Sequence, residues 1–365
     1  MGTLSFLPWT TIDRSYRIGP FEVAPVAIVD RRASRLKDVV EPDTDMRSIL
    51  SSYRDQHDQP IASATLIRFA DRSWSADLTE DEIERVFGLT EALAFSGLAE
   101  REFFTHSGYC NRDSFTGIVQ RFRPGASGAS LRSRRRDGGT SSYWSAELLR
   151  VRQEPHIVEL RGYAITALTA PSFNAMETDE GFDLAIRAFN EANTDRATMS
   201  QTHELISTVS AFQQLFGIRG GDVASTARSF ADALTRVPLA SVKPKKPRSE
   251  EFVARRGLRQ AWMYDMATMR GSVAHGNRQG SYPSIWSVQE HLLLAAFIFP
   301  LLVKLRLSAS GYTLTREDRL ELGLFDYYLA SENVLAPANE LDGVATSHVW
   351  SQLRANLWLE IDIDW

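Results

Sequence analysis

Cysteine is nearly absent from this sequence, which has one residue of that type, Cys110, in 365. A single cysteine excludes an intrachain disulfide and a thiolate metal cluster. The histidines, including His106 close to Cys110, do not show the spacing of metal ligands, so we expect no metal site. The scarcity of cysteine suits a reducing compartment and predicts a cytoplasmic location.

Long apolar runs are also missing. The longest, Leu292 to Val303, contains Pro300 and falls short of the roughly 20 residues that span a bilayer, so we expect a buried helix and no membrane partner. The start, MGTLSFLPWTTIDR, lacks the basic and apolar regions of a secretory signal. The motifs G-x-x-x-x-G-K-[ST], G-x-G-x-x-G and G-x-S-x-G do not occur, and we expect no cofactor.

The sequence also lacks an overall basic charge, since its net charge is −5. Contact with nucleic acid would therefore depend on local basic stretches. Two such stretches occur, an arginine-rich one in a Gly/Ser frame from Arg121 to Gly139 and KPKKPRS from Lys243 to Ser249. We interpret both as long loops, which are either simply solvated or able to contact phosphate groups without reading a base sequence.

The N-terminal part, residues 1–170, is expected to be a mainly β domain. Short runs rich in β-branched and aromatic residues alternate there with Pro, Gly and Asp. A helix interrupts them from Thr79 to Gly97, and it opens with Thr79 and Glu82 in the order of a capping box. The strand-like runs are SYRIGPFEVAPVAIV (15–29), PIASATLIRF (60–69), FTGIVQRF (115–122) and HIVELRGYAITAL (156–168).

The next part, residues 171–330, has helical periodicity and predicts an all-α bundle, so the chain as a whole is assigned to the α+β class. Residues 331–365 are expected to form a less regular extension that ends in the strand-like LWLEIDIDW. The five expected helices lie within residues 183–195, 198–218, 222–237, 250–276 and 284–307.

The stretch MRGSVAHGNRQG contains the most suggestive pair of residues, Arg270 and His275, near the expected end of the fourth of these helices. Histidine exchanges protons near neutral pH, and arginine forks onto phosphate oxygens. RNA cleavage through the 2′-hydroxyl needs both properties. The purely structural alternative is a histidine that stabilises the negative end of the helix dipole next to a solvated arginine.

Geometry limits how this pair could act. Five residues advance a helix by about 7.5 Å and leave the two side chains roughly 140° apart. They could converge on one ligand if the helix unwinds at Gly271, or if a second copy of the chain supplies the partner group.

The stretch MYDMATMRGSVAHG resembles the signature of the HEPN superfamily, particularly its ApeA-like branch, in which an arginine precedes a histidine by a short spacer and glycine commonly follows. The segment from Phe189 to Ile218 is similar to earlier helices of that branch. The resemblance covers roughly residues 173 to 310 and implies a HEPN-like helical domain. Two positions differ from the usual pattern, because Gly271 follows the arginine and Gln213 stands where the branch tends to carry an acid.

The resemblance implies a metal-independent endoribonuclease that acts as a homodimer on RNA, with Arg270 and His275 as catalytic residues. It further implies a bacterial antiviral defence (abortive infection) or toxin setting. A phage-derived trigger or a neutralising partner protein would then act on the enzyme. The N-terminal domain would either sense the trigger or restrain the nuclease. The alternative is a non-catalytic HEPN module that binds RNA or protein.

Supporting roles are expected for residues around the motif. Asn277 and Arg278 could contact the RNA backbone, and Tyr264 could stack on a base. Gln213, or else Glu204 on the same expected helix, could orient the motif. If a cognate enzyme silences the protein by nucleotidylation, Tyr264 and Tyr282 are the candidate acceptors. The structural alternatives are that Asn277 and Arg278 are solvated loop residues and that Tyr264 is an aromatic residue of the core.

Overall fold

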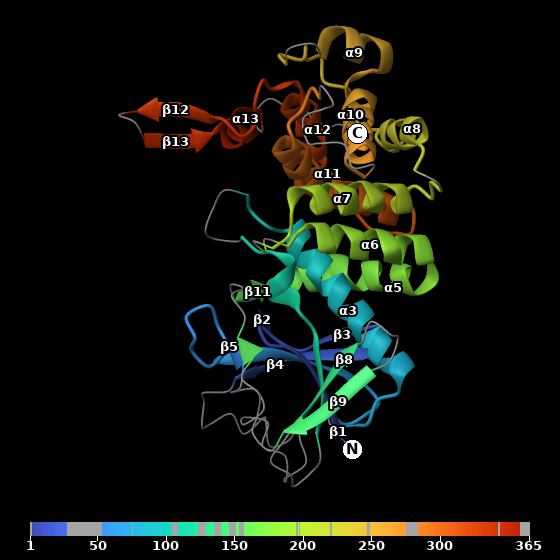
Figure 1. Ribbon diagram of the computed structural model, residues 1–365, viewed down its shortest axis with the longest axis vertical. Helices are drawn as coiled ribbons and strands as arrows, with labels where there is room; N and C mark the ends of the chain where they lie inside the picture. Colours follow the sequence, from blue (N-terminus) through green and yellow to red (C-terminus); the bar gives the residue numbers. More distant parts are fainter. Residues whose placement is uncertain are drawn as a thin grey trace. The chain divides into compact units, whose positions relative to one another are not determined.

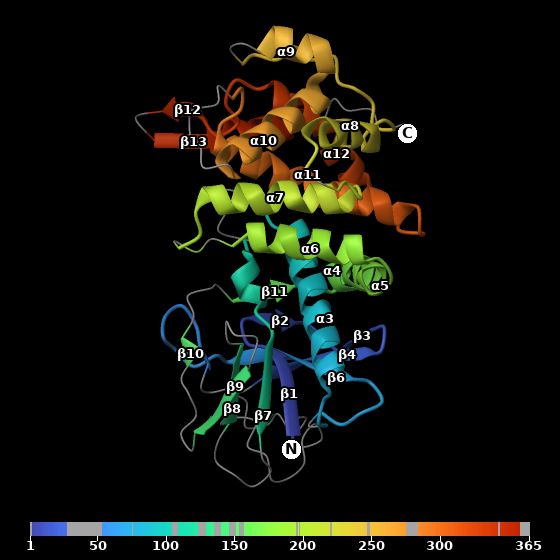
Figure 2. The same cartoon turned by 45° about the vertical axis from the view of Figure 1, so that its right-hand side comes forward.

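The chain divides into two compact units, Met1–Glu177 and Thr178–Trp365 (Figures 1 and 2). The first contains an antiparallel sheet and the second is mostly helical, which confirms the α+β class. The computed structural model describes residues 2–27, 53–74, 76–103, 109–122, 129–134, 140–145, 151–152, 157–194, 196, 198–219, 221–246, 249–274, 284–341 and 344–357.

The first unit is built on a seven-stranded antiparallel sheet in the order β3-β4-β6-β1-β7-β8-β9 (Figure 2). The N-terminal strand β1 lies between β6 and β7. Leu4 and Phe6 alternate along β1 and share one apolar cluster with Trp9, as the two-residue period of a strand requires. The strands are β1 (Gly2–Leu7), β3 (Tyr16–Ile18), β4 (Phe21–Ala27), β6 (Ser63–Phe69), β7 (Ile118–Phe122), β8 (Ala129–Arg134) and β9 (Thr140–Ser145).

Two short parallel pairs accompany this sheet. One joins β2 (Thr10–Ile12) to β11 (Val158–Leu160), and the other joins β5 (Tyr53–Arg54) to β10 (Val151–Arg152). A 3₁₀ turn, η1 (Arg112–Phe115), precedes β7.

Helix α3 (Glu80–Ala99) confirms the predicted helix and its capping box. The Thr79 hydroxyl accepts from the Glu82 amide, and the Glu82 carboxylate accepts from the Thr79 amide. Leu89 and Leu93, one turn apart on this helix, are fully buried. The N-terminal end of the helix is thus specified locally, and its apolar face joins the core.

Two expectations for the first unit were wrong. Within the stretch 121–139, which was interpreted as a loop, residues 129–134 form β8 and pair with β9. Backbone pairing with a neighbouring strand overrides the Gly/Ser-rich composition there. The strand expected over 156–168 is confirmed only for β11. From Gly162 the chain is helical, because Ala164, Ile165 and Leu168 are buried at helical spacing.

This helical segment consists of three consecutive parts. They are α4 (Gly162–Ala164), a π-helical turn labelled η2 (Ile165–Thr169) and α5 (Ala170–Thr178). Inside the π turn, the Thr169 hydroxyl donates to the Ser96 hydroxyl of α3 at 2.8 Å. The Ser96–Thr169 contact is fully buried and joins the segment to α3.

The second unit is a helical bundle in which α6 and α7 lie side by side and α8 packs against α10 (Figures 1 and 2). Its core is aromatic, with the Phe212 ring contacting those of Phe230, Trp262 and Phe299. The helices are α6 (Glu180–Ala192), α7 (Gln201–Leu215), α8 (Val223–Ala233), α9 (Ser249–Arg256), α10 (Leu258–Ala274), α11 (Val288–Ser308), α12 (Arg316–Ala330) and α13 (Val349–Leu357).

The single helix expected over 250–276 is two helices. Gly257 adopts a φ of 78° and separates α9 from α10, a left-handed conformation that favours glycine. Helix α10 then continues through Gly271 to Ala274, so the expectation that it could unwind at Gly271 was wrong.

Beyond α11 the chain is more regular than expected. Helix α12 was not predicted, although Thr315 and Asp318 form a capping box at its start. The C-terminal extension contains a hairpin of β12 (Pro337–Leu341) and β13 (Val344–His348), followed by α13. Of the strand-like end LWLEIDIDW, residues 358–365 lie outside the described residues.

Helix α11 alone in the described part of the chain is long and apolar enough to cross a membrane. Most of its most apolar window, 61%, is buried inside the second unit. This burial agrees with the expected core helix and is compatible with a soluble protein.

Candidate functional site

The candidate site lies at the C-terminal end of α10, where Arg270 is half-buried. Its Nε atom is buried and has no hydrogen-bond partner in the described part of the chain. The guanidinium lies beside the turn that precedes α8, since a Cβ added to Gly221 would be 3.4 Å from Nη1. Buried guanidinium donors normally have partners, so Arg270 retains capacity to bind an acceptor.

His275, Asn277 and Arg278, together with Tyr282, lie in the segment 275–283, outside the described residues. Helix α10 ends at Ala274, the residue directly before His275. The described end of the helix therefore places Arg270 in its last turns.

Gln213 connects α7 to the first turn of α8. Its buried side-chain amide donates to the Thr226 hydroxyl at 3.1 Å, and that hydroxyl donates to the Asp222 carbonyl at 2.6 Å. Asp222 is the N-cap of α8 and follows Gly221, which Arg270 approaches. Gln213 therefore stabilises the same turn beside which Arg270 lies.

Glu204, the other residue considered for orienting the motif, is half-buried in the first turn of α7. Nine residues separate it from Gln213, which turns a helix by about 900° and puts the two side chains on opposite faces. Glu204 and Gln213 are therefore not interchangeable in position.

Tyr264 is half-buried and packs toward α9. Its ring makes an edge contact with Phe252 at a centroid distance of 5.8 Å, and the Arg256 guanidinium carbon lies 4.2 Å from its centroid. Such a cation–π contact stabilises the position of α9 against α10 across the break at Gly257. The structure thus gives Tyr264 a packing role in the described region.

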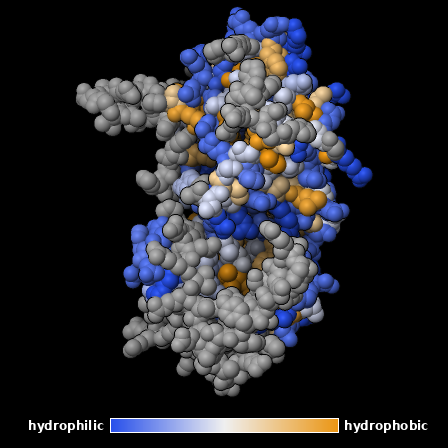
Figure 3. All heavy atoms as spheres, viewed as in Figure 1, coloured by the Kyte–Doolittle hydropathy of each residue, from blue (hydrophilic) through white to orange (hydrophobic). Residues whose placement is uncertain are grey.

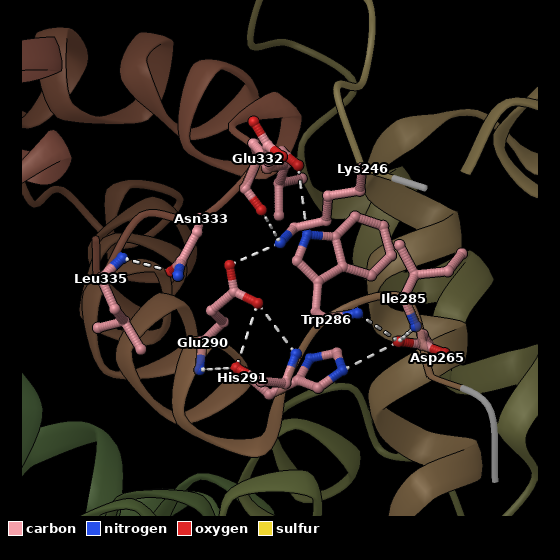
Figure 4. Close-up of polar contacts among 11 residues, drawn as sticks. Lys246, Asp265, Ile285, Trp286, Glu290, His291, Glu332, Asn333 and Leu335 are labelled. Carbon is pink, nitrogen blue, oxygen red and sulfur yellow. Dashed lines mark hydrogen bonds and ion pairs between the residues drawn. The ribbon is translucent and has the colours of Figure 1, made fainter. Parts of the chain in front are cut away.

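A buried network that was not expected from the sequence lies near the start of α11 (Figure 4). The Asp265 Oδ2 atom accepts from the amides of Ile285 and Trp286 at 3.0 and 3.2 Å and lies 3.2 Å from His291 Nε2. Both side chains are almost completely inaccessible. Asp265 on α10 therefore anchors the backbone of Ile285 and Trp286, just before α11.

This contact indicates which ring nitrogen of His291 donates. An ionised carboxylate only accepts hydrogen bonds, so Nε2 is assigned as the donor to Asp265. The Nδ1 atom is buried and lacks a partner within the described ranges, as does Asp265 Oδ1. His291 therefore has a buried structural role, which its isolated place in the sequence did not reveal.

The basic stretch 243–249 is not uniformly solvated. Lys246 is buried, and its Nζ donates to Glu290 Oε1 at 2.6 Å and to the Glu332 carbonyl at 2.7 Å (Figure 4). Lys243 and Lys245 are exposed. Interpreting the whole stretch as a solvated or phosphate-contacting loop was wrong for Lys246, because a carboxylate far along the sequence neutralises it.

Among the residues that the structure describes, no three His, Cys, Asp or Glu side chains gather to hold a metal ion. Burial raises the pKa of the Cys110 thiol to about 11, which disfavours the nucleophilic thiolate.

Comparison with models of known protein families, with curated proteins and with solved structures finds no match to this chain.

Proposed function

We propose that the second unit is a HEPN-like, metal-independent endoribonuclease, with Arg270 and His275 as its catalytic residues. The observation that carries the proposal is the buried Nε of Arg270, which has no hydrogen-bond partner among the described residues. Arg270 lies in the last turns of α10, which ends at Ala274, and His275 follows directly. A permanent cation with unused donors is suited to a phosphate that gains charge during a reaction.

The proposed reaction uses the RNA, these two side chains and water as the second proton carrier. The RNA 2′-oxygen forms a bond to the adjacent phosphorus while the bond from phosphorus to the 5′-oxygen breaks. His275 either removes the 2′-proton while water protonates the departing 5′-oxygen, or protonates that oxygen while water takes the 2′-proton. Arg270 stabilises the charge on the phosphoryl oxygens. The products are a 2′,3′-cyclic phosphate and a 5′-hydroxyl end.

A homodimer fits this proposal because α10 remains helical through Gly271. On a helix that continued beyond Ala274, positions 270 and 275 would point about 140° apart, and one copy alone would not present both groups to one phosphate. A two-fold contact would let the second copy supply the missing group.

The biological setting follows the same proposal. An RNA-degrading protein of the bacterial cytoplasm would act in defence or as a toxin, and its first unit would sense a trigger or restrain the nuclease. A phage-derived trigger or a neutralising partner protein would set its activity.

The first test is cleavage of total tRNA and mRNA by the full chain with EDTA present. We expect the wild type to cut and to leave cyclic-phosphate ends, and His275→Ala to lose cleavage by about 10²-fold or more. His57→Ala is the matched control, because His57 is an exposed histidine of the first unit. Equal cleavage by wild type and His275→Ala would contradict the proposal.

One observation favours a second candidate, a non-catalytic module that binds RNA or protein. Gln213, at the position where an acid is usual in the resembling branch, is engaged in a buried hydrogen bond with Thr226. This arrangement supplies no carboxylate to orient a catalytic histidine. Binding of RNA without cleavage, together with equal toxicity of wild type and His275→Ala in cells, would favour this candidate.

A further inference from the structure

A groove of about 790 Å³ lies at the C-terminal end of α12, between the segment 241–245 and α13. Its walls are mainly apolar and include Val242, Val349 and Leu353, while Lys243 and Lys245 line it as exposed cations. Nothing in the proposed reaction uses this groove.

Burial alternates along the segment that forms one wall. Ser241, Lys243 and Lys245 are exposed, whereas Val242 and Pro244 are half-buried. The two lysines both line the groove, and neither makes an ion pair with another described residue.

The lysine segment is held firmly. The Lys245 amide donates to the Ala330 carbonyl at 2.9 Å, and Lys246 is locked between Glu290 and the Glu332 carbonyl (Figure 4). Trp286, which Asp265 on α10 anchors, donates its ring N–H to the Leu329 carbonyl at 3.2 Å. One hydrogen-bonded network thus connects the groove to the helix that carries Arg270.

The remaining lining groups suit a nucleotide chain. Tyr327 offers a half-buried ring, and Ser241, Ser331 and Asn333 offer hydrogen-bonding groups. Binding of single-stranded RNA commonly combines cations for phosphates with aromatic and apolar surfaces for bases. Glu332 also lines the groove. The two lysines and this carboxylate together give the groove a net positive formal charge.

We infer that this groove is a subsite for single-stranded RNA, in which Lys243 and Lys245 contact phosphates outside the bond to be cleaved. The inference rests on the proposed function and assigns to it a substrate-binding surface separate from Arg270. We assign these contacts to uniform binding, equal in the ground state and the transition state, which lowers KM and leaves kcat unchanged.

The test measures binding of a single-stranded RNA oligonucleotide to the full chain carrying His275→Ala, with and without Lys243→Glu and Lys245→Glu. We expect the double charge reversal to weaken Kd roughly tenfold. We also expect the slope of log K against log salt to become shallower by about 1.4, because each phosphate contact with a single strand contributes about 0.7.

A matched control reverses Arg236 and Arg316, which are also exposed in the second unit and do not line the groove. Equal weakening by the control pair would overturn the inference, as would unchanged affinity and salt slope in the lysine variant. Loss of a co-purifying protein alone, with RNA binding intact, would overturn it in favour of an acidic peptide as occupant.

Cleavage kinetics distinguish failure of this inference from failure of the proposed function. In a chain with His275 intact, Lys243→Glu with Lys245→Glu should raise KM and leave kcat within about twofold. If neither the wild type nor any variant cleaves RNA, the proposed function fails. The binding measurement still tests whether the groove binds RNA. If wild type cleaves and KM is unchanged, only the groove is excluded.

Discussion

The two ends of α10 each carry an arginine, and the surroundings of these arginines differ. Arg259, near the start, forms a bidentate ion pair with Asp326 and donates to the carbonyls of Leu234, Val237 and Pro238. Arg270, near the end, has a buried Nε without a partner among the described residues. The two arginines therefore differ in the supply of acceptors: the fold provides five contacts for Arg259 and none for the Nε of Arg270 among the described residues.

The hydrophilic surface around α9 shows a third situation (Figure 3). Arg255 pairs there with Glu251 on the same helix, and both side chains are largely exposed. Exposed pairs of this kind contribute little to stability. Only the environment of Arg270 combines burial with unused donors in this comparison.

The largest expected effect is the loss of stability when the fully paired arginine, Arg259, is replaced. Arg259→Ala should lower the free energy of unfolding by about 3–5 kcal/mol, because Asp326 would be left as a buried, uncompensated charge. Urea denaturation followed by circular dichroism would measure this. Replacing both residues, Arg259→Met with Asp326→Leu, should recover most of the loss, and failure to recover would indicate that the carbonyl contacts dominate.

Next in size is the effect on the unpaired arginine. Arg270→Ala should reduce RNA cleavage by about 10²–10³-fold, the range for loss of a group that stabilises transition-state charge, while the free energy of unfolding changes by no more than about 0.5 kcal/mol. Parallel cleavage assays and urea denaturation would measure both quantities. A large loss of stability with unchanged cleavage would show that the two arginines do not differ in the way proposed.

A smaller effect on the free energy of unfolding is expected at Glu321, where pairing with Arg354 does not offset the cost of burial. Burial raises the pKa of Glu321 on α12 from 4.5 to about 7, even though Arg354 lies 2.8 Å away and opposes the shift. When folding raises the pKa of a carboxyl group, the folded protein loses stability as the pH rises from about 4.5 to 7, because the unfolded state gives up the proton first. Glu321→Gln should therefore increase the free energy of unfolding by about 1–3 kcal/mol near pH 8.

The same substitution should have little effect near pH 4.5, where the carboxyl is largely neutral in both states. Glu317→Gln is the control, since Glu317 also contacts Arg354 but is 62% exposed. Denaturation curves over this pH range would test the pair, and a pH-independent effect of Glu321→Gln would contradict the expected titration.

The smallest expected effect concerns the turn beside Arg270. Gln213→Leu removes the buried hydrogen bond to Thr226 and should cost about 1 kcal/mol of stability, with cleavage within twofold of wild type. Gln214→Leu, at the neighbouring half-buried glutamine, serves as the control. A selective loss of cleavage in Gln213→Leu would instead give Gln213 a direct part in orienting the site.

Local signals in the sequence predicted local features well. The capping box of α3 was recognised from Thr79 and Glu82, and the same signal at Thr315 and Asp318 could have identified α12. The break between α9 and α10 also has a local signal that the prediction overlooked, since Arg255 and Arg256 in a last turn followed by Gly257 are typical of a helix C-terminus.

For the candidate site, the sequence identified a motif but not its surroundings. The contact between Arg270 and the turn at Gly221 joins segments far apart in the chain, and no periodicity encodes it. Composition likewise could not separate Lys246 from Lys243 and Lys245, because the difference depends on Glu290, which follows 44 positions later.

Glu290 takes part in two stabilising interactions at once. One carboxylate oxygen completes the capping box of α11 by accepting from the Ser287 amide, and the other pairs with Lys246. The energetic effects of changing Ser287 and Lys246 should therefore not add, with a coupling of about 0.5–3 kcal/mol. Among natural variants of this chain, the residues at 246 and 290 should consequently covary, an acid at one position accompanying a cation at the other.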